Sequence, residues 1–257
     1  MAPDGVRIGG DMRLARVKGR GVRTALRRAV VIGLAAMMPA GAARAWTPPQ
    51  GFATAAHAWE TGDYATARNL FGRLAEAGDA RAAFYLGVMA EQGQGGEADP
   101  AAAASWYDRA ADAGDARAAF NLARLLDQGA GPALPVDPVR AAMLYEQAAR
   151  AGIVAADTGL ALMQLDGRAA GGDAAAARSR LLRAARAGDG AADHALALRA
   201  LAGDPPDMVE AVARCRRAVA RGYAPAHALL DQLSAAADPG LLEAAAAREP
   251  VLDTPGN

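Results

Sequence analysis

The 257-residue sequence has few of the residues that build a β-sheet or a disulfide framework. Aromatic residues make up only 5% of it, and it has one cysteine, Cys215, and one lysine, Lys18. Alanine is the commonest residue, which suits closely packed helices and fits a sheet of branched and aromatic residues poorly. One cysteine excludes an internal disulfide, so packing alone must hold the core together.

Long apolar runs are also absent, apart from one short stretch near the N-terminus. Basic residues crowd residues 1–28, an apolar run follows over residues 29–38, and Ala43-Arg44-Ala45 comes just before Trp46. These three features are typical of a secretory signal peptide. The alternative is a membrane anchor, but the run falls short of the ~20 apolar residues that span a bilayer. We expect a signal peptide over residues 1–45, cleaved after Ala45, and a periplasmic or secreted protein with no membrane insertion after cleavage.

Cleavage would change the net charge of the chain. The whole sequence has 28 basic and 28 acidic residues, whereas residues 46–257 keep 19 basic and 26 acidic ones, a net charge near −7. Nucleic acid and anionic lipid surfaces repel an acidic protein. Neither is expected as a partner.

What the sequence does contain is a repeat. The stretch EAGDARAAFYL at residue 76 returns as DAGDARAAFNL at residue 112. Glycines recur at intervals of 34 to 38 residues, and an aspartate precedes each of them by 15 residues. The five pairs are Asp63 and Gly78, Asp99 and Gly114, Asp137 and Gly152, Asp173 and Gly188, and Asp207 and Gly222. A period in this range is the signature of a repeat architecture.

Each segment between aspartate and glycine has the pattern of an amphipathic helix. Apolar residues lie 4, 7, 8 and 11 positions after most of the aspartates, which places them on one helical face. Aspartate is a favoured N-cap, and glycine ends a helix in the left-handed conformation. A first helix, from Arg81 to Gln92 in one copy, follows the potential cap Asp79. The sequence therefore predicts helical hairpins that must stack because none can bury its apolar face alone.

One copy of the repeat has the order Ala82-x3-Leu86-Gly87, Gly93-x-Gly95, Asp99-x3-Ala103-x2-Trp106-Tyr107-x2-Ala110-Ala111-x2-Gly114. This order resembles a Sel1-like repeat, a relative of the tetratricopeptide repeat. The resemblance implies an all-α fold, a right-handed α-solenoid of tandem helix–turn–helix repeats over residues 46–249. The expected repeats are about 52–79, 80–115, 116–153, 154–189 and 190–223. A capping pair over 224–249 and a disordered tail over 250–257 complete the expected organisation.

Motifs that carry chemistry are scarce. The three histidines, His57, His194 and His227, belong to no metal-binding motif, and no serine lies in a nucleophile motif. Cys215 takes the slot of Tyr107 and Tyr145, so it is expected to be a buried small hydrophobe; the alternative is a reactive thiol. We expect no cofactor, no metal and no enzymatic activity. The alternative is an enzyme acting on cell-wall peptide or β-lactam, since some Sel1-repeat proteins are described so, but that branch typically carries a cysteine pair in each repeat.

The resemblance also implies where a partner would bind. In such solenoids the first helices line a concave groove, and the facing slots lie five and two residues before the repeated leucine and two after it. These slots hold Arg81, Phe84, Val88, Arg117, Phe120, Arg124, Thr158, Leu162, His194 and Leu198. Arginine and phenylalanine suit carboxylate contacts and apolar anchoring. In the alternative interpretation the phenylalanines pack between helices, and Arg81 and Arg117 pair locally with Asp79 and Asp115.

The function expected from these features is that of an exported, non-enzymatic repeat protein that binds a protein or peptide partner. By analogy with relatives, such a protein would scaffold or regulate an envelope or signalling complex.

Overall fold

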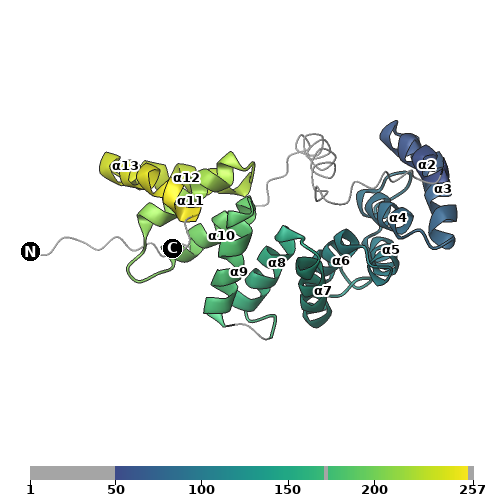
Figure 1. Ribbon diagram of the computed structural model, residues 1–257, viewed down its shortest axis with the longest axis horizontal. Helices are drawn as coiled ribbons and strands as arrows, with labels where there is room; N and C mark the ends of the chain where they lie inside the picture. The colour runs from purple at the N-terminus through teal and green to yellow at the C-terminus, as the bar shows by residue number, and fades with distance from the viewer. Residues whose placement is uncertain (1–49, 171–172, 254–257) are drawn as a thin grey trace, which may run out of the picture. The chain divides into compact units, whose positions relative to one another are not determined.

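The computed structural model describes residues 50–170 and 173–253, and all regular structure in that part of the chain is helical (Figure 1). The α-helices are α2 (Gln50–Glu60), α3 (Tyr64–Glu76), α4 (Ala80–Gln92), α5 (Pro100–Asp112), α6 (Ala116–Gln128), α7 (Pro138–Arg150), α8 (Val154–Leu165), α9 (Ala174–Arg186), α10 (Gly190–Leu201), α11 (Met208–Ala220), α12 (Pro225–Ala236) and α13 (Pro239–Arg248). No helix in these two ranges is both long and apolar enough to cross a bilayer. The predicted all-α class is confirmed. The predicted signal peptide lies outside the described residues.

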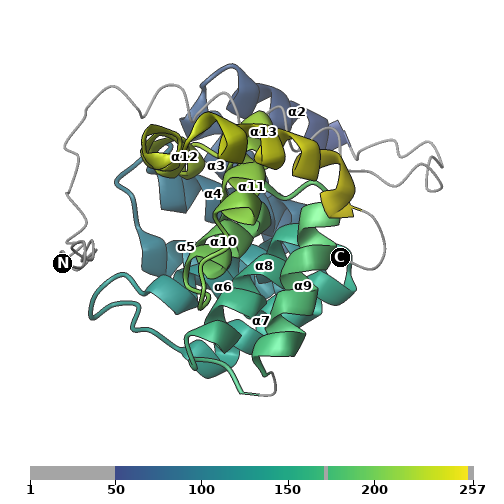
Figure 2. The ribbon, with the colours of Figure 1, turned by 90° about the vertical axis from the view of Figure 1, so that its left-hand side faces the viewer.

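Each helix from α2 to α11 packs against the next one in the chain, so the elements form hairpins that stack in sequence order. The hairpins are α2–α3, α4–α5, α6–α7, α8–α9 and α10–α11. The last pair differs, because α12 and α13 both pack against α11, which Figure 2 shows with the C-terminal helices toward the viewer. This arrangement confirms the predicted α-solenoid.

Aspartate N-caps start the second helix of every hairpin. The side chains of Asp63, Asp99, Asp137, Asp173 and Asp207 each accept a hydrogen bond from a backbone N–H in the first turn. Each cap satisfies a donor that the helix leaves unpaired, and is worth about 1 kcal/mol. The five aspartates that recur in the sequence are therefore helix starts, as predicted.

Glycines end the same helices. Gly78, Gly114, Gly152, Gly188 and Gly222 all have positive φ, between 78° and 97°. At the end of α3, Gly78 donates to the carbonyl of Ala75, and Asp79 donates to the carbonyl of Leu74. This pair of bonds is a Schellman motif, which satisfies the last carbonyls of the helix and turns the chain sharply. The other four helices end with the same two bonds.

Small residues on the first helix let large residues of the second helix come close. Tyr107 of α5 is 1% exposed, and a Cβ added at Gly87 of α4 would lie 2.5 Å from two of its ring carbons. The glycine therefore makes room for the tyrosine ring. In the last repeat the equivalent slot holds Cys215, which is fully buried, as predicted for a small hydrophobe.

The C-terminal segment differs from the expected disordered tail over residues 250–257. Glu249–Asp253 form a 3₁₀ helix, η1, that packs against α11 and α13. The physical reason is Leu252, which is 1% exposed and belongs to the same buried cluster as Cys215. Burying this leucine offsets the cost of ordering the short segment.

Candidate functional site

The residues predicted to line a groove lie on the first helices α4, α6, α8 and α10. The structure divides them into two groups. Those on α4 and α6 mostly contact groups of their own chain, whereas those on α8 and α10 include side chains exposed to solvent.

Arg81 and Arg117 each pair with the aspartate that caps their own helix. Arg81 Nη2 lies 2.7 Å from Asp79 Oδ2, and Arg117 Nη2 lies 2.5 Å from Asp115 Oδ2. Burial opposes ionisation of Asp79, but the hydrogen bonds and charge of Arg81 outweigh it and lower the pKa of the carboxyl group. These contacts are the ones expected in the alternative interpretation, in which Arg81 and Arg117 pair locally instead of facing a groove.

Each of these two arginines also lies over an aromatic ring on the first helix of the preceding hairpin. The Arg81 Cζ is 4.5 Å from the ring centroid of Phe52, and the Arg117 Cζ is 4.3 Å from that of Phe84. Such cation–π contacts are worth about 0.5–1 kcal/mol, and more where water is excluded. Phe84 is itself buried. This set therefore joins successive first helices to one another.

The other predicted residues on α4 and α6 are half-buried, and one of them, Arg124, already has a partner in the chain. Val88 and Phe120 are both intermediate in exposure. Arg124 forms an ion pair with Glu91, and Glu91 accepts a hydrogen bond of 2.9 Å from the Tyr107 hydroxyl. Burial and the Glu91 charge raise the pKa of Tyr107, so its hydroxyl stays protonated and remains a donor.

The predicted residues on α8 and α10 present an apolar surface. Leu162 is 38% exposed and Leu198 is 45% exposed, and the two occupy the same repeat position on neighbouring first helices. His194 lies one turn before Leu198 and is half-buried, and burial lowers the pKa of its imidazole. Thr158 is buried, and its hydroxyl donates to Asp189 at 2.6 Å. We call the surface formed by Leu162, His194 and Leu198 the leucine face.

Sequence reasoning missed a buried ionic cluster between α10 and α11. Asp193 is 0% exposed and faces three guanidinium groups. Arg214 Nη1 lies 3.0 Å from one carboxylate oxygen, Arg217 Nε lies 3.4 Å from the other, and Arg221 also contacts that second oxygen. Burial raises the pKa of Asp193, and the three arginines oppose that shift.

A signal for this cluster does exist in the repeat pattern. Asp193 and Arg214 occupy positions held by Ala83 and Trp106 in the 80–115 repeat. An aspartate and an arginine have thus replaced an alanine and a large apolar residue within one hairpin. The α8–α9 hairpin shows the same exchange, with Arg180 Nη1 2.9 Å from Asp157 Oδ1.

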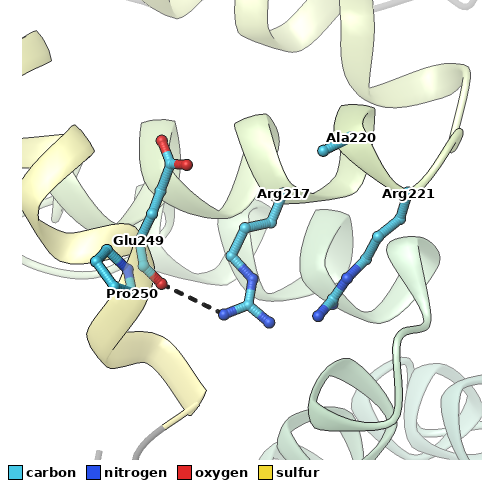
Figure 3. Close-up of a pocket in the computed structure, with 5 residues that line it drawn as sticks. All are labelled: Arg217, Ala220, Arg221, Glu249 and Pro250. Carbon is cyan, nitrogen blue, oxygen red and sulfur yellow. Dashed lines mark hydrogen bonds between the residues drawn. The ribbon is translucent and has the colours of Figure 1, made fainter.

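A cavity of about 410 Å³ opens beside this cluster (Figure 3). Arg217, Ala220 and Arg221 line it from the end of α11, and Glu249 and Pro250 line it from η1. Figure 3 shows the two arginine side chains leaving α11 on the same side. Arg217 Nη1 donates to the Glu249 carbonyl at 3.5 Å.

A second cavity, of about 610 Å³, lies among α3, α4, α5 and the loop before α5. Its lining includes Arg68, Leu86, Glu97 and Trp106, and none of the residues predicted for the groove. Within the described ranges, no group of three or more His, Cys, Asp or Glu side chains is placed to hold a metal ion.

Comparison with known proteins agrees with this architecture. The family model of the Sel1 repeat matches residues 80–115 and 116–153, the bounds expected for two of the repeats. No curated protein sequence matches the chain.

Three solved structures share the fold. A protective antigen of uropathogenic Escherichia coli strains, described as having an SLR fold, is 22% identical with a TM-score of 0.62; the match covers 79% of this chain but only 52% of the antigen, so the chain spans about half its length. A Sel1 repeat protein from Oxalobacter formigenes is 25% identical with a TM-score of 0.62, over 77% of this chain and 84% of the other. An immunity protein from Pseudomonas aeruginosa is 17% identical with a TM-score of 0.51, over 81% and 84%.

Two successive hairpins thus match the Sel1 sequence pattern, and the stack that contains them has the architecture of solved Sel1-repeat proteins. Residues 80–153 therefore carry two Sel1 repeats, and they lie within an α-solenoid.

Proposed function

We propose that this protein is an exported, non-enzymatic adaptor that binds a protein partner of the cell envelope through the leucine face. Sel1-repeat proteins are generally protein–protein interaction modules, which supports a binding role. The observation that carries the proposal is the exposure of Leu162 and Leu198 at equivalent positions of adjacent first helices.

Single exposed apolar residues are common, but adjacent ones form a patch of the kind that marks interaction sites. First helices of neighbouring repeats pack side by side, and packed helix axes lie about 8–10 Å apart. One apolar side chain of a partner can therefore contact both leucines. The lowered pKa of His194 keeps its ring neutral at neutral pH, so the patch needs no anionic partner group.

Arg81, Phe84 and Arg117 have a smaller part in this proposal than in the sequence-based one. Their side chains already contact Asp79, Tyr107 and Asp115 of the same chain. A partner would have to replace those contacts, whereas Leu162 and Leu198 of the leucine face are exposed to solvent.

The test is cross-linking in cells that carry the native partner. A photo-reactive residue placed at Arg199, which is exposed on α10 next to Leu198, should give discrete adducts with an envelope protein. The double variant Leu162→Glu/Leu198→Glu should abolish these adducts, because two buried carboxylates at an apolar contact are costly.

The control is Val139→Glu/Met143→Glu, which changes two apolar residues on the second helix α7 that are 71% and 69% exposed, more than the two leucines. This variant should keep the adducts. Adducts that persist in the leucine variant, or that both variants abolish equally, would remove the leucine face from the proposal.

Export is the second part of the proposal. The sequence pattern places cleavage after Ala45, and the first described helix begins at Gln50, so cleavage leaves every described helix intact. Mass spectrometry of the periplasmic fraction should find an N-terminus at Trp46. An intact N-terminus in the cytoplasmic fraction would contradict export without affecting the leucine face.

A further inference from the structure

The cavity of about 610 Å³ among α3, α4 and α5 is lined by three small residues, one on each helix. They are Gly72, Ala90 and Ala102. One repeat further along the chain, the equivalent positions hold Asp108, Leu126 and Arg140. Leu126 is 6% exposed, and the Arg140 guanidinium group pairs with the Asp108 carboxylate. The next repeat therefore has large side chains, including a paired guanidinium group, at the positions that are small around this cavity.

The lining of the cavity carries more negative than positive groups. Its charged side chains are Arg68, Glu76, Glu97 and Asp99, one basic and three acidic. Asp99 is occupied as the N-cap of α5, where it accepts two backbone N–H groups. The Glu76 and Glu97 carboxylates have no hydrogen bond or ion pair with any of residues 50–170 and 173–253. Two carboxylates at the cavity are therefore available to a ligand.

The two arginines of this region contact groups other than these carboxylates. Arg68 Nη2 donates to the Gln94 carbonyl at 3.4 Å. Arg109, which does not line the cavity, donates to the Ala75 carbonyl at 3.2 Å, and its Cζ lies 4.7 Å from the centroid of the Trp106 ring. Even with both arginines counted, the three carboxylates of the lining outnumber the positive groups, which favours a cationic ligand.

The loop that supplies Glu97 is fixed against the first hairpin. The Gln94 side chain accepts a hydrogen bond of 2.6 Å from the Trp59 indole, and a Cβ added at Gly95 would lie 3.1 Å from the Tyr64 Cβ. A wall that is already held in place loses little conformational freedom when a ligand binds.

We propose that this cavity binds the arginine side chain of a peptide or protein partner, with its guanidinium group paired with Glu76 and Glu97. Arginine suits the site because its planar fork matches carboxylates and its face stacks on aromatic rings such as that of Trp106. Leu86 and Ala90 form an apolar lining for the alkyl part of the side chain. The cavity volume lies within the ~300–1,000 Å³ of ligand pockets.

This site is separate from the leucine face, because it lies on α3, α4 and α5 rather than on α8 and α10. Its ligand is recognised mainly by charge, so the failure of either proposal leaves the other intact.

The experiment titrates the full purified protein with acetyl-arginine amide and, separately, with acetyl-citrulline amide, which has nearly the same shape but no charge. The readout is the NMR signal of the Trp106 indole N–H, identified by its loss in Trp106→Phe. The arginine probe should shift this signal saturably. Glu76→Gln and Glu97→Gln should each weaken binding about fivefold. Glu60→Gln is the control, because Glu60 is exposed on α2 outside the lining, and it should leave the affinity unchanged.

A second set of variants fills the cavity instead of removing its charges. Gly72→Asp/Ala102→Arg copies the Asp108–Arg140 pair of the next repeat and should abolish binding, because the new guanidinium group occupies the site. Ser105→Arg adds the same charge to an exposed position of α5 outside the lining and should keep most of the binding.

Free arginine distinguishes the two sources of a guanidinium group. Tighter binding of acetyl-arginine amide than of free arginine supports an arginine within a peptide, whereas the reverse would assign the site to the free amino acid and overturn the peptide ligand. The proposal is also overturned if the citrulline probe binds as tightly as the arginine probe. The same holds if Glu76→Gln/Glu97→Gln or the filled variant binds as the unaltered protein does.

Discussion

Replacement of Asp193 by asparagine should destabilise the α10–α11 hairpin more than any other single charge change in the described part of the chain. The substitution keeps the shape and one carbonyl acceptor but removes the carboxylate that Arg214, Arg217 and Arg221 share. Arg214 keeps its ion pair with Glu210 at 3.2 Å. Removing one partner from a buried ion pair costs about 3–5 kcal/mol, because the remaining charges stay buried without compensation. Asp193 is 0% exposed and Arg214 is 2% exposed, so water cannot take over.

Amide hydrogen exchange is the suitable assay, because repeat proteins unfold locally and each hairpin has its own stability. A loss of about 3 kcal/mol raises the opening constant more than a hundredfold, since each 1.4 kcal/mol is a factor of ten. The amides of α10 and α11 should show this increase. Those of α4 and α5, several hairpins away, should exchange as before.

Asp157→Asn is the comparison. Asp157 contacts both Arg180 and Arg183, but its side chain is 19% exposed, and ion pairs near the surface contribute about 0–1 kcal/mol. If Asp193→Asn changes exchange in α10 and α11 no more than Asp157→Asn does in α8 and α9, the cluster is not an uncompensated buried charge and the reasoning fails.

Three further outcomes follow from the same packing. Gly87→Ala should lower the free energy of unfolding in urea by about 1–3 kcal/mol, because the added Cβ would lie 2.5 Å from the Tyr107 ring. Gly72→Ala is the control, since a Cβ there would have nothing within 4 Å, and it should be neutral or stabilising. Equal effects of the two substitutions would contradict the close contact at Gly87. Burial lowers the pKa of His194 from 6.5, so the unfolded chain binds a proton at this residue at a higher pH than the folded protein does. The melting temperature should therefore fall as pH drops below 6.5, and His194→Gln should lessen that fall. Equal slopes of melting temperature against pH for the two proteins would contradict this prediction. Burial and the Asp193 charge raise the pKa of Cys215 to about 11, so a thiol reagent at pH 8 should label the unfolded protein far faster than the native one, and equal rates would show that the thiol is accessible.

The fold could be predicted from the sequence because its signals are local. Asp63 and Gly78 begin and end one helix through hydrogen bonds with backbone atoms only a few residues away. The spacing of these two residues in the sequence therefore predicts the bounds of the helix. The same two signals recur at each repeat. Residues 250–253 belong to the tail expected to be disordered over 250–257, but they are ordered in η1, because the burial of Leu252 depends on a surface of α11 that only the folded chain provides.

The candidate site was less predictable. The slots on the first helices were identified by resemblance, but whether a slot is open depends on what packs against it. Arg124 and Leu162 occupy the same slot, two residues after the repeated leucine, yet Arg124 pairs with Glu91 while Leu162 remains exposed. A helical pattern assigns a residue to a face and does not report its contacts with neighbouring repeats.

The two hairpins that match the Sel1 pattern and the two that follow them differ in a way that bears on function. All four keep the aspartate cap and the terminal glycine of the second helix, so the stack continues unchanged. The later two replace the alanine and apolar pair of the earlier hairpins with Asp157 and Arg180, and with Asp193 and Arg214.

Such an exchange gains little stability, since a buried ion pair is often no better than the apolar contact that it replaces. Departures from a fold's own pattern tend to lie where function requires them. Here they lie on the hairpins that also carry Leu162 and Leu198. The repeats that depart from the family pattern, rather than those that match it, are therefore where the partner of the leucine face should be sought.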